Sequence, residues 1–284
     1  MTILDPDSHV SIVGCGLIGG SFALALRRAG FKGRLTAWDD PATIRLAVER
    51  GVIDGPEESF NNGTLTQARL LFLAAPIGGI VDFLRRHAHL ISPRTIVTDA
   101  GSTKAEICQV ARDCLPAEVS FIGGHPMAGS EHSGVEYSRA DLFDRATWAL
   151  VPEPTREAGS FEEIRALVET IGARPITVSP EEHDRTVAIV SHLPQIISTT
   201  LASLLATPHP STPLEAGSEM TTSLDPLSID LARTMAAGGW RDMTRLAASS
   251  FGIWRDIIIT NQPHLTSALD QFIARLQLLS EGLE

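Results

Sequence analysis

The feature that most constrains this chain is a set of three spaced glycines between an apolar stretch and a helical pattern. His9–Val13 is a strand candidate, the next six residues read G-C-G-L-I-G, and a helical pattern continues to Arg28. In a G-x-G-x-x-G motif the glycines allow a tight turn, close approach of a pyrophosphate and packing of helix on strand. The helix N-terminus also offers unpaired N–H groups to phosphates. The motif predicts a dinucleotide site formed by Gly14, Gly16, Leu17, Ile18 and Gly19.

An acidic residue supports this interpretation. The second strand candidate, Arg34–Trp38, is followed directly by Asp39, about twenty residues after Gly19. A carboxylate at this place accepts hydrogen bonds from the ribose hydroxyls of the cofactor. Asp40 adds a second negative charge, which would repel the 2′-phosphate of NADP. The sequence therefore predicts NAD as the cofactor, with Asp39 as its ribose-binding residue.

Short apolar runs alternate with helical patterns through the first half of the chain. This alternation is typical of an α/β unit with a parallel sheet. Helical patterns after the second strand occupy Ile44–Arg50 and Val81–Leu90. The further strands are expected at Leu70–Ala74, Thr95–Thr98, Ser120–Ile122, Thr147–Val151 and Pro175–Val178.

The pattern changes at Ser179. Ser179, Pro180 and Glu182 match an N-cap serine, a proline at the first helical position and the glutamate of a capping box. No good strand follows, and apolar residues recur at helical spacing. We therefore expect two domains, an α/β domain over residues 1–179 and an all-α domain over residues 180–284. The proline-rich segment Thr207–Pro213 is expected to be a loop.

Composition narrows the choice of ligands and partners. The 284 residues carry a formal net charge of −11, with 43% hydrophobic residues. The negative charge disfavours nucleic acid, and it means that an anionic small substrate needs a local basic pocket. No apolar run approaches the roughly 18 residues of a membrane span. Neither nucleic acid nor a membrane is therefore expected as a partner.

The cysteines indicate the compartment. Cys15, Cys108 and Cys114 show neither a C-x-x-C pair nor metal-ligand spacing, so neither a disulfide framework nor a metal site is expected. The first residues lack the basic region and apolar run of a signal peptide. Reduced thiols in a cytoplasmic protein are the expectation.

Four further motifs carry residues suited to chemistry. They are Asp99-Ala100-Gly101-Ser102-Thr103-Lys104, His125-Pro126-Met127-Ala128-Gly129-Ser130-Glu131, Ser191-His192-Leu193-Pro194-Gln195 and Gly238-Gly239-Trp240-Arg241-Asp242-Met243-Thr244-Arg245. Their order and spacing behind the glycine motif resemble the prephenate/arogenate dehydrogenase family over nearly the whole chain. The resemblance implies a Rossmann-type domain followed by a helical domain that forms a homodimer. It also implies transfer of a hydride from ring C4 of prephenate or arogenate to NAD⁺, with loss of the C1 carboxylate as CO₂.

The resemblance also implies roles for two residues near the ring hydroxyl. His125 would accept a hydrogen bond from the hydroxyl and help to remove its proton, which suits a side chain that titrates near neutral pH. Ser102 would lie near the same hydroxyl and the nicotinamide. Ser102 also precedes a helical pattern, where it would serve as an N-cap.

Substrate carboxylates call for arginine, whose planar guanidinium binds them in bidentate fashion. Arg245 matches the family's carboxylate-binding arginine. Arg241 would share its helix face, but a surface ion pair explains it better. Glu131 matches an acid that can pair with the binding arginine at the pocket mouth, and a solvated loop charge is its alternative.

Pro194 lies inside a helical pattern, where it cannot donate to the carbonyl of Val190 and predicts a kink. Such a kink would direct His192 toward the substrate cleft, although a buried, satisfied histidine is the alternative. Gln195 stands where some prephenate-preferring relatives have histidine. Glutamine both donates and accepts, so the substrate can be prephenate, with a pyruvyl group, or arogenate, with an aminoacyl group.

Two other functions fit parts of the pattern. A 3-hydroxyacid dehydrogenase also joins a Rossmann domain to a helical one, but it would use a lysine of the helical half, and Lys32 and Lys104 both lie in the first half. A NAD-binding sensor without turnover would lack the full set of His125, Ser102 and Arg245.

Overall fold

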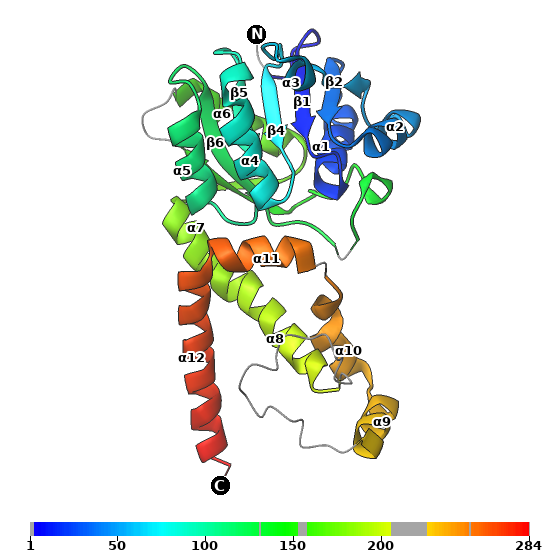
Figure 1. The fold of residues 1–284 in the computed structure, drawn as a ribbon, viewed down its shortest axis with the longest axis vertical. Coiled ribbons are helices and arrows are strands. Elements are labelled where there is room, and N and C mark those ends of the chain that lie inside the picture. Colours follow the sequence, from blue (N-terminus) through cyan, green and yellow to red (C-terminus); the bar gives the residue numbers. More distant parts are fainter. Residues whose placement is uncertain (1–2, 131, 153–157, 206–225, 250, 284) are drawn as a thin grey trace.

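The structure is a computed structural model that describes residues 3–130, 132–152, 158–205, 226–249 and 251–283. An α/β layer contains the first half of the chain, and long helices extend away from it (Figure 1). The loop expected at Thr207–Pro213 lies outside the described residues. Among the described helices, none is long and apolar enough to cross a membrane.

One eight-stranded sheet organises the first half, in the order β3-β2-β1-β4-β5-β6-β7-β8. Every neighbouring pair is parallel except β6 and β7, which are antiparallel. The strands are β1 (His9–Val13), β2 (Arg34–Trp38), β3 (Gly55–Pro56), β4 (Leu70–Leu73), β5 (Ile96–Asp99), β6 (Ser120–Pro126), β7 (Thr147–Pro152) and β8 (Arg174–Thr177).

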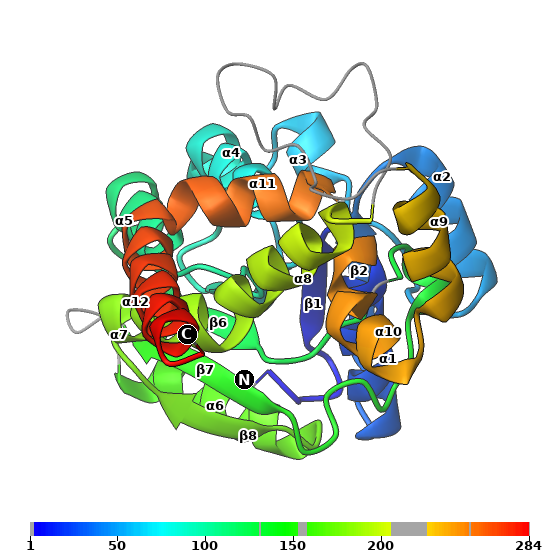
Figure 2. The same ribbon diagram turned by 90° about the horizontal axis from the view of Figure 1, so that it is seen from below.

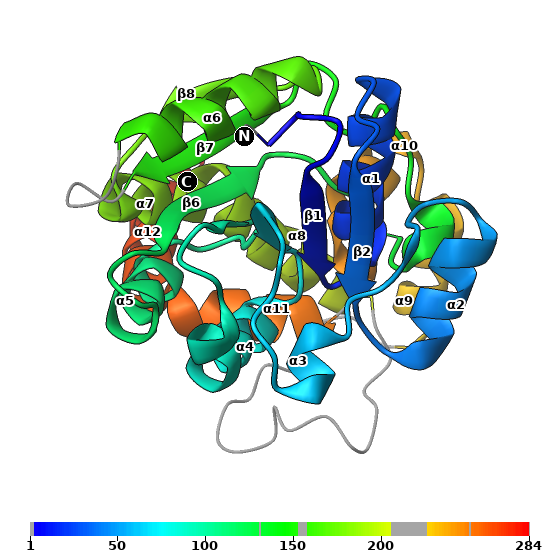
Figure 3. The same ribbon diagram turned by 90° about the horizontal axis from the view of Figure 1, so that it is seen from above.

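Helices cover both faces of this sheet (Figure 3). Because successive side chains of a strand point to opposite faces, β4 sends Leu70 and Phe72 into one core cluster and Leu71 and Leu73 into the other. The first cluster packs against α1 and α6, and the second against α4 and α5. The helices of this half are α1 (Leu17–Arg28), α2 (Pro41–Glu49), α3 (Ser59–Asn62), α4 (Ile77–His87), α5 (Ala105–Cys114) and α6 (Ala158–Thr170).

The predicted α/β class is confirmed, with several local differences: no ranges were predicted for α5 and α6, and α4 begins at Ile77, before the expected Val81. The expected strand at Ser120–Ile122 continues to Pro126, because Gly123 and Gly124 keep pairing with β7 despite their low strand propensity. The short elements β3 and α3 carry too few residues to show any periodicity, and the sequence did not predict them.

The helical half begins at α7 (Pro180–Val187). Its capping box is present as expected, because Ser179 Oγ accepts from Glu182 N–H (3.2 Å) and the Glu182 carboxylate accepts from Ser179 N–H (3.1 Å). Among the described residues after Ser179 there is no strand. The later helices are α8 (Leu193–Ser203), α9 (Pro226–Met235), α10 (Gly238–Thr244), α11 (Phe251–Thr260) and α12 (Gln262–Glu281).

A π-helical turn, η3 (Ala188–His192), joins α7 to α8. Pro194 lies in the first turn of α8, where its missing N–H is tolerated. The π turn is wider than an α-helical turn, and it lies just before Pro194, which it accommodates. The chain therefore continues as helix through the position of the predicted kink.

The helical half docks against loops that follow the sheet strands. Asp256 of α11 accepts a hydrogen bond from Gly78 N–H at the start of α4 (2.9 Å), and the hydroxyls of Thr103 and Thr260 lie 2.8 Å apart. Figure 2 looks onto these helices with the sheet behind them. Because these loops follow the carboxyl ends of parallel strands, the junction lies where such sheets bind ligands.

Candidate active site

The glycine loop after β1 has a backbone geometry that requires glycine at two positions, Gly14 and Gly19. Gly14 has φ +89°, in the left-handed region, and a Cβ there would lie 2.7 Å from Ala75 N. A Cβ on Gly19 would lie 2.0 Å from the Gly14 carbonyl oxygen. Because Gly19 has no side chain, α1 can pack closely against the loop. Gly16, the N-cap of α1, faces open space. The loop is thus tight against the protein at its ends and open in the middle.

The first turn of α1 adds backbone donors at this loop. Leu17 is buried and Ile18 is half-buried, and they are the first two residues of the helix. The N–H groups of an opening helical turn have no partner within the helix. They are therefore available to an anion beside Gly16.

Asp39 closes the same loop from the end of β2. Its Oδ2 accepts from Cys15 N–H at 2.6 Å, and its Oδ1 accepts from Asp40 N–H at 2.7 Å. Burial, helped by the charge of Asp39, raises the pKa of the Cys15 thiol to about 12, so the thiol stays protonated. The carboxylate is thereby held beside the glycine loop.

Asp40 has a structural role in addition to the charge expected of it. Its carboxylate accepts from Ala42 N–H (2.9 Å) and Thr43 N–H (3.1 Å), which makes it the N-cap of α2. The hydrogen bond from the Thr43 hydroxyl lowers the pKa of Asp40. Asp40 therefore remains charged near the loop, but its oxygens serve the helix.

A buried carboxylate joins the loop of Ser102 to the strand of His125. Asp99, at the end of β5, accepts from Gly101 N–H at 2.8 Å and from Gly124 N–H at 2.9 Å. It also forms an ion pair with Lys104, and both side chains are fully buried. The structure thus brings half-buried Ser102 and buried His125 to neighbouring places at the end of the sheet.

The expected N-cap role of Ser102 is wrong. The first residue of α5 is Ala105, and its capping groups come from the helical half of the chain. The Asp184 carboxylate of α7 accepts from Lys104 N–H at 2.7 Å and from Ala105 N–H at 2.9 Å. Ser102 is left free of this structural task.

His125 continues this polar cluster. Its Nδ1 lies 2.8 Å from His183 Nε2, and His183 Nδ1 lies 2.7 Å from Asp184 Oδ1. Burial lowers the pKa of His125 well below its usual value, and the neighbouring charges of His183, Lys104 and His192 lower this pKa further. Burial alone would raise the pKa of Asp184, but hydrogen bonds from His183 and from the backbone lower it overall. The site therefore contains a neutral histidine beside an ionised carboxylate.

His192 belongs to the same buried cluster. Its Nδ1 lies 3.1 Å from Asn261 Nδ2, which also donates to the Asp184 carbonyl at 2.8 Å. The ring meets Trp254 edge-on, with centroids 5.8 Å apart. Burial lowers the pKa of His192 to about 4, so this histidine is neutral. The sequence left open that His192 is simply a buried histidine with its hydrogen bonds satisfied. This holds for its Nδ1, which has Asn261 as its partner.

Gln195 and Arg245 lie on neighbouring segments. Gln195 is buried, and its Nε2 donates to the Leu246 carbonyl at 2.9 Å while its Oε1 has no partner. Ala247 N–H donates to Ser198 Oγ at 3.1 Å, which fixes the same 3₁₀ turn, η5 (Arg245–Ala248), against α8. Arg245 begins this turn with its side chain exposed.

The structure does not bring the remaining predicted residues, Arg241 and Glu131, into the polar cluster around His125. Arg241 is exposed on α10, which ends at Thr244, so it does not share one continuous α-helix with Arg245. Glu131 lies outside the described residues. Across the part of the chain that is described, no cluster of three or more His, Cys, Asp or Glu residues could hold a metal ion.

Sequence reasoning missed the residues behind His125, namely His183, Asp184 and Asn261. The only local signal was two adjacent titratable residues in the first turn of a capped helix, which is also typical of a solvated helix start. Their burial depends on docking of α7 against α5, which is a tertiary contact.

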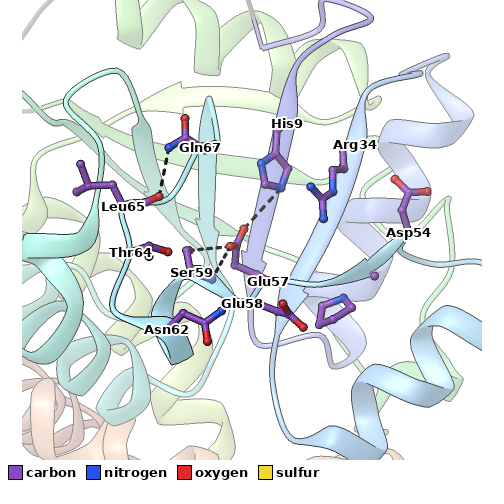
Figure 4. A pocket seen from close by; sticks show the side chains of 12 residues that line it. His9, Arg34, Asp54, Glu57, Glu58, Ser59, Asn62, Thr64, Leu65 and Gln67 are labelled. Atoms are coloured by element: carbon purple, nitrogen blue, oxygen red, sulfur yellow. Dashed lines mark hydrogen bonds and ion pairs between the residues drawn. The ribbon is translucent and has the colours of Figure 1, made fainter.

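A hollow of about 500 Å³ lies at the amino-terminal ends of β1 and β2 (Figure 4). His9 and Arg34, the first residues of β1 and β2, line it together with Glu57. The Glu57 carboxylate accepts from Ser59 and Thr36, and His9 Nε2 lies 2.8 Å from the Thr36 hydroxyl. The side chains of His9, Thr36, Glu57 and Ser59 satisfy one another, at the end of the strands away from the glycine loop.

A dinucleotide-type loop, a buried histidine at the end of a parallel strand and a docked helical domain define a nucleotide-binding dehydrogenase. The family model described as "Prephenate dehydrogenase, nucleotide-binding domain" matches residues 22–177, and "Prephenate dehydrogenase, dimerization domain" matches residues 179–284. The chain belongs to the prephenate dehydrogenase family. This membership decides against the alternatives of a 3-hydroxyacid dehydrogenase and of a sensor without turnover.

Individual relatives agree with the family. Prephenate dehydrogenase of Bacillus subtilis is 34% identical over 278 residues, which cover 97% of this chain and 70% of that protein. The structure of Aquifex aeolicus prephenate dehydrogenase with hydroxyphenyl propionate and NAD⁺ has 31% identity and a TM-score of 0.82, over 96% of this chain and 90% of that one. Arogenate dehydrogenase of Synechocystis has 30% identity and a TM-score of 0.75, over 96% and 91%.

Proposed function

We propose that this protein catalyses the NAD-dependent oxidative decarboxylation of prephenate to 4-hydroxyphenylpyruvate, a step of tyrosine biosynthesis. The observation that carries the proposal is the neutral, buried His125 beside the loop of Ser102, at the edge of the sheet that also bears the glycine loop. In this reaction the hydride leaves ring C4, and the C1 carboxylate leaves as CO₂. Aromatisation of the ring supplies the driving force.

The glycine loop fits a dinucleotide. The space beside Gly16, the opening N–H groups at Leu17 and Ile18 and the carboxylate of Asp39 suit a pyrophosphate and a ribose. NAD⁺, when bound there, supplies the hydride acceptor. The charges of Asp39 and Asp40 disfavour the extra phosphate of NADP⁺.

His125 accepts the hydrogen bond of the ring hydroxyl and takes its proton while the hydride leaves. Once CO₂ has left, the ring oxygen is a phenolate, and it takes the proton back to give the phenol product. The reaction thus releases no net proton, and the histidine holds one only briefly. Ser102 is proposed to orient the same hydroxyl from the adjacent loop.

The substrate side is proposed to lie toward the helical half. The exposed guanidinium of Arg245 binds a substrate carboxylate, which supplies the local positive charge that a chain of net charge −11 needs. His192 and Gln195 contact the substrate from η3 and α8. Glu131 remains proposed as the acid that pairs with Arg245.

Arogenate is a second candidate substrate, and one observation favours it. The Leu246 carbonyl fixes the Gln195 amide so that Oε1 is the buried atom without a partner. A buried acceptor is best satisfied by a donor. The ammonium group of arogenate is such a donor, whereas the keto oxygen of the prephenate side chain is another acceptor.

We also propose that the protein works as a homodimer of its helical halves. The end of α12 exposes Leu276, Leu278 and Leu279, with 48%, 68% and 66% of each side chain accessible. Large apolar side chains left exposed at one end of a helix favour an interface there. The match of this half to a dimerization domain supports the proposal.

NADH formation with prephenate and with arogenate, each with NAD⁺ and NADP⁺, tests the function. We expect turnover with NAD⁺ and at least one of the two acids. The ratio of kcat/KM for the two acids ranks the substrates. Absence of NADH with both acids would refute the proposed reaction, and equal turnover with NADP⁺ would refute the assigned cofactor.

A further inference from the structure

We infer that His183 and Asp184 form a relay with His125 that selects which His125 nitrogen acts as the base and shares its proton during the reaction. The inference rests on the proposed function, because it extends the role assigned there to His125. Since neither His183 nor Asp184 is assigned a contact with the substrate, they are positioning residues. Their effect on the reaction passes through His125.

The relay consists of short contacts between buried groups. His125, His183 and Asp184 have 8%, 3% and 1% of their surfaces exposed. The two contacts measure 2.8 Å and 2.7 Å between heavy atoms. His125 comes from β6 and the other two from α7, so docking of the helical half completes the relay.

The hydrogen-bond partners determine the position of each proton. The Asp184 carboxylate already accepts two backbone N–H groups at the N-terminus of α5, so it is an ionised acceptor there. His183 Nδ1 must therefore donate to Asp184, and His183 Nε2 is left with a lone pair. His125 Nδ1 then donates to that lone pair. The consequence is that His125 Nε2 carries no proton and is free to act as the base.

The relay also provides a place for the positive charge. When the substrate O–H bond breaks and a bond to His125 Nε2 forms, the Nδ1 proton can move to His183 Nε2. The charge then resides on His183 beside the Asp184 carboxylate. The reverse movements return one proton to the phenolate oxygen of the product, so protons balance over the cycle.

The surroundings explain why such sharing matters. His125 is buried, and it faces His183, Lys104 and His192, each of which disfavours a charge on its ring. Lys104 is itself paired with Asp99, and His192 is bonded to Asn261. Asp184 is the carboxylate that remains to balance an imidazolium in this cluster, among the groups described.

Histidine tautomers offer the direct test. In protein labelled with isotopic nitrogen in its histidines, NMR should show His125 with hydrogen on Nδ1 in the full chain with NAD⁺ bound. In Asp184→Asn the new NH₂ has to face either both His183 Nδ1 and Lys104 N–H, which share one oxygen of Asp184, or Ala105 N–H at the other oxygen. The first arrangement reverses the relay and moves the His125 hydrogen to Nε2, which leaves no free base.

Kinetics complete the test. We expect Asp184→Asn to lower kcat by about 10²-fold or more, the scale of a lost general base, with unchanged KM for both substrates. His183→Gln keeps an acceptor for His125 but cannot carry the proton, so it should lose less, about 10-fold. Glu181→Gln is the matched control, because it removes an exposed carboxylate from the same helical turn, and its kcat should stay at the wild-type value.

The outcomes separate the relay from the function. An Nε2–H tautomer of His125 in the wild type overturns the relay, even if no variant folds. Wild-type kcat in Asp184→Asn and His183→Gln overturns it as well. Absence of NADH formation in the wild type overturns the proposed function instead, while the tautomer measurement still decides whether the relay exists.

Discussion

The two halves of the molecule bury their apolar side chains very differently. In the nucleotide-binding half, all four residues of β4 are fully buried between helices on both faces of the sheet. In the helical half, the buried cluster contains only Ala188, Leu193 and Ala268 among the described residues.

The difference identifies what each half needs for stability and function. Full burial of one large apolar side chain contributes about 1.5–3 kcal/mol to folding. Because many such side chains are buried on both faces of the sheet, the sheet half is stabilised by a core of its own. The helical half has to gain burial from its docking surface and, in the proposed homodimer, from a second copy. The polar cluster around His125 forms where the halves meet, so the proposed chemistry depends on their contact.

The largest effect is expected at this junction. His125→Asn should lower kcat by about 10²-fold or more, because it removes the base. Cofactor binding, followed by NADH fluorescence, and the melting temperature should change little, since neither core is touched. Near-normal turnover would remove His125 from its proposed role.

The next effect tests the helical half as a substrate-binding surface. Arg245→Gln should raise the KM for the substrate about 10-fold or more, because hydrogen bonds between charged groups contribute about 1.5–3 kcal/mol. Arg185→Gln, another exposed arginine of this half, is the control and should leave KM unchanged. Steady-state kinetics that show the same KM for Arg245→Gln and wild type would contradict the assignment.

A pair of glycine variants tests the nucleotide-binding half. Gly19→Ala should destabilise the fold by about 1–3 kcal/mol, because the new Cβ has no room beside the Gly14 carbonyl. Gly16→Ala meets open space, so it should keep stability and weaken only NAD⁺ binding. Urea unfolding and NAD⁺ titration separate the two effects. Equal stability of both variants would show that the loop is looser than described.

The smallest effect concerns Asp40. Asp40→Ala should cost about 1 kcal/mol of folding free energy through loss of the α2 N-cap. The KM for NAD⁺ should stay the same, because the Asp40 oxygens bind α2. A large change in cofactor preference without loss of stability would contradict this assignment and show that Asp40 acts mainly at the cofactor site.

The sequence predicts what depends on local patterns. The glycine motif, the strand that precedes Asp39 and the capping box at Ser179 all use neighbours within a few residues, and the structure has them where expected. Membership of the family, inferred from four short motifs, is confirmed as well.

The features missed depend on contacts between distant segments. Ser102 looks like an N-cap, but the α5 cap comes from Asp184, about eighty residues further along the chain. His183 looks like part of a solvated helical turn, but docking buries it against His125. The effect of Pro194 depends on a π turn that no local propensity predicts.

The central claim is that one reaction both oxidises and decarboxylates the substrate at this junction. The most direct test is to measure NADH and CO₂ together, with prephenate labelled in its ring carboxylate and NAD⁺ in excess. The account predicts equal molar amounts of the two products at every time point. NADH without labelled CO₂ would show a simple alcohol oxidation and contradict it.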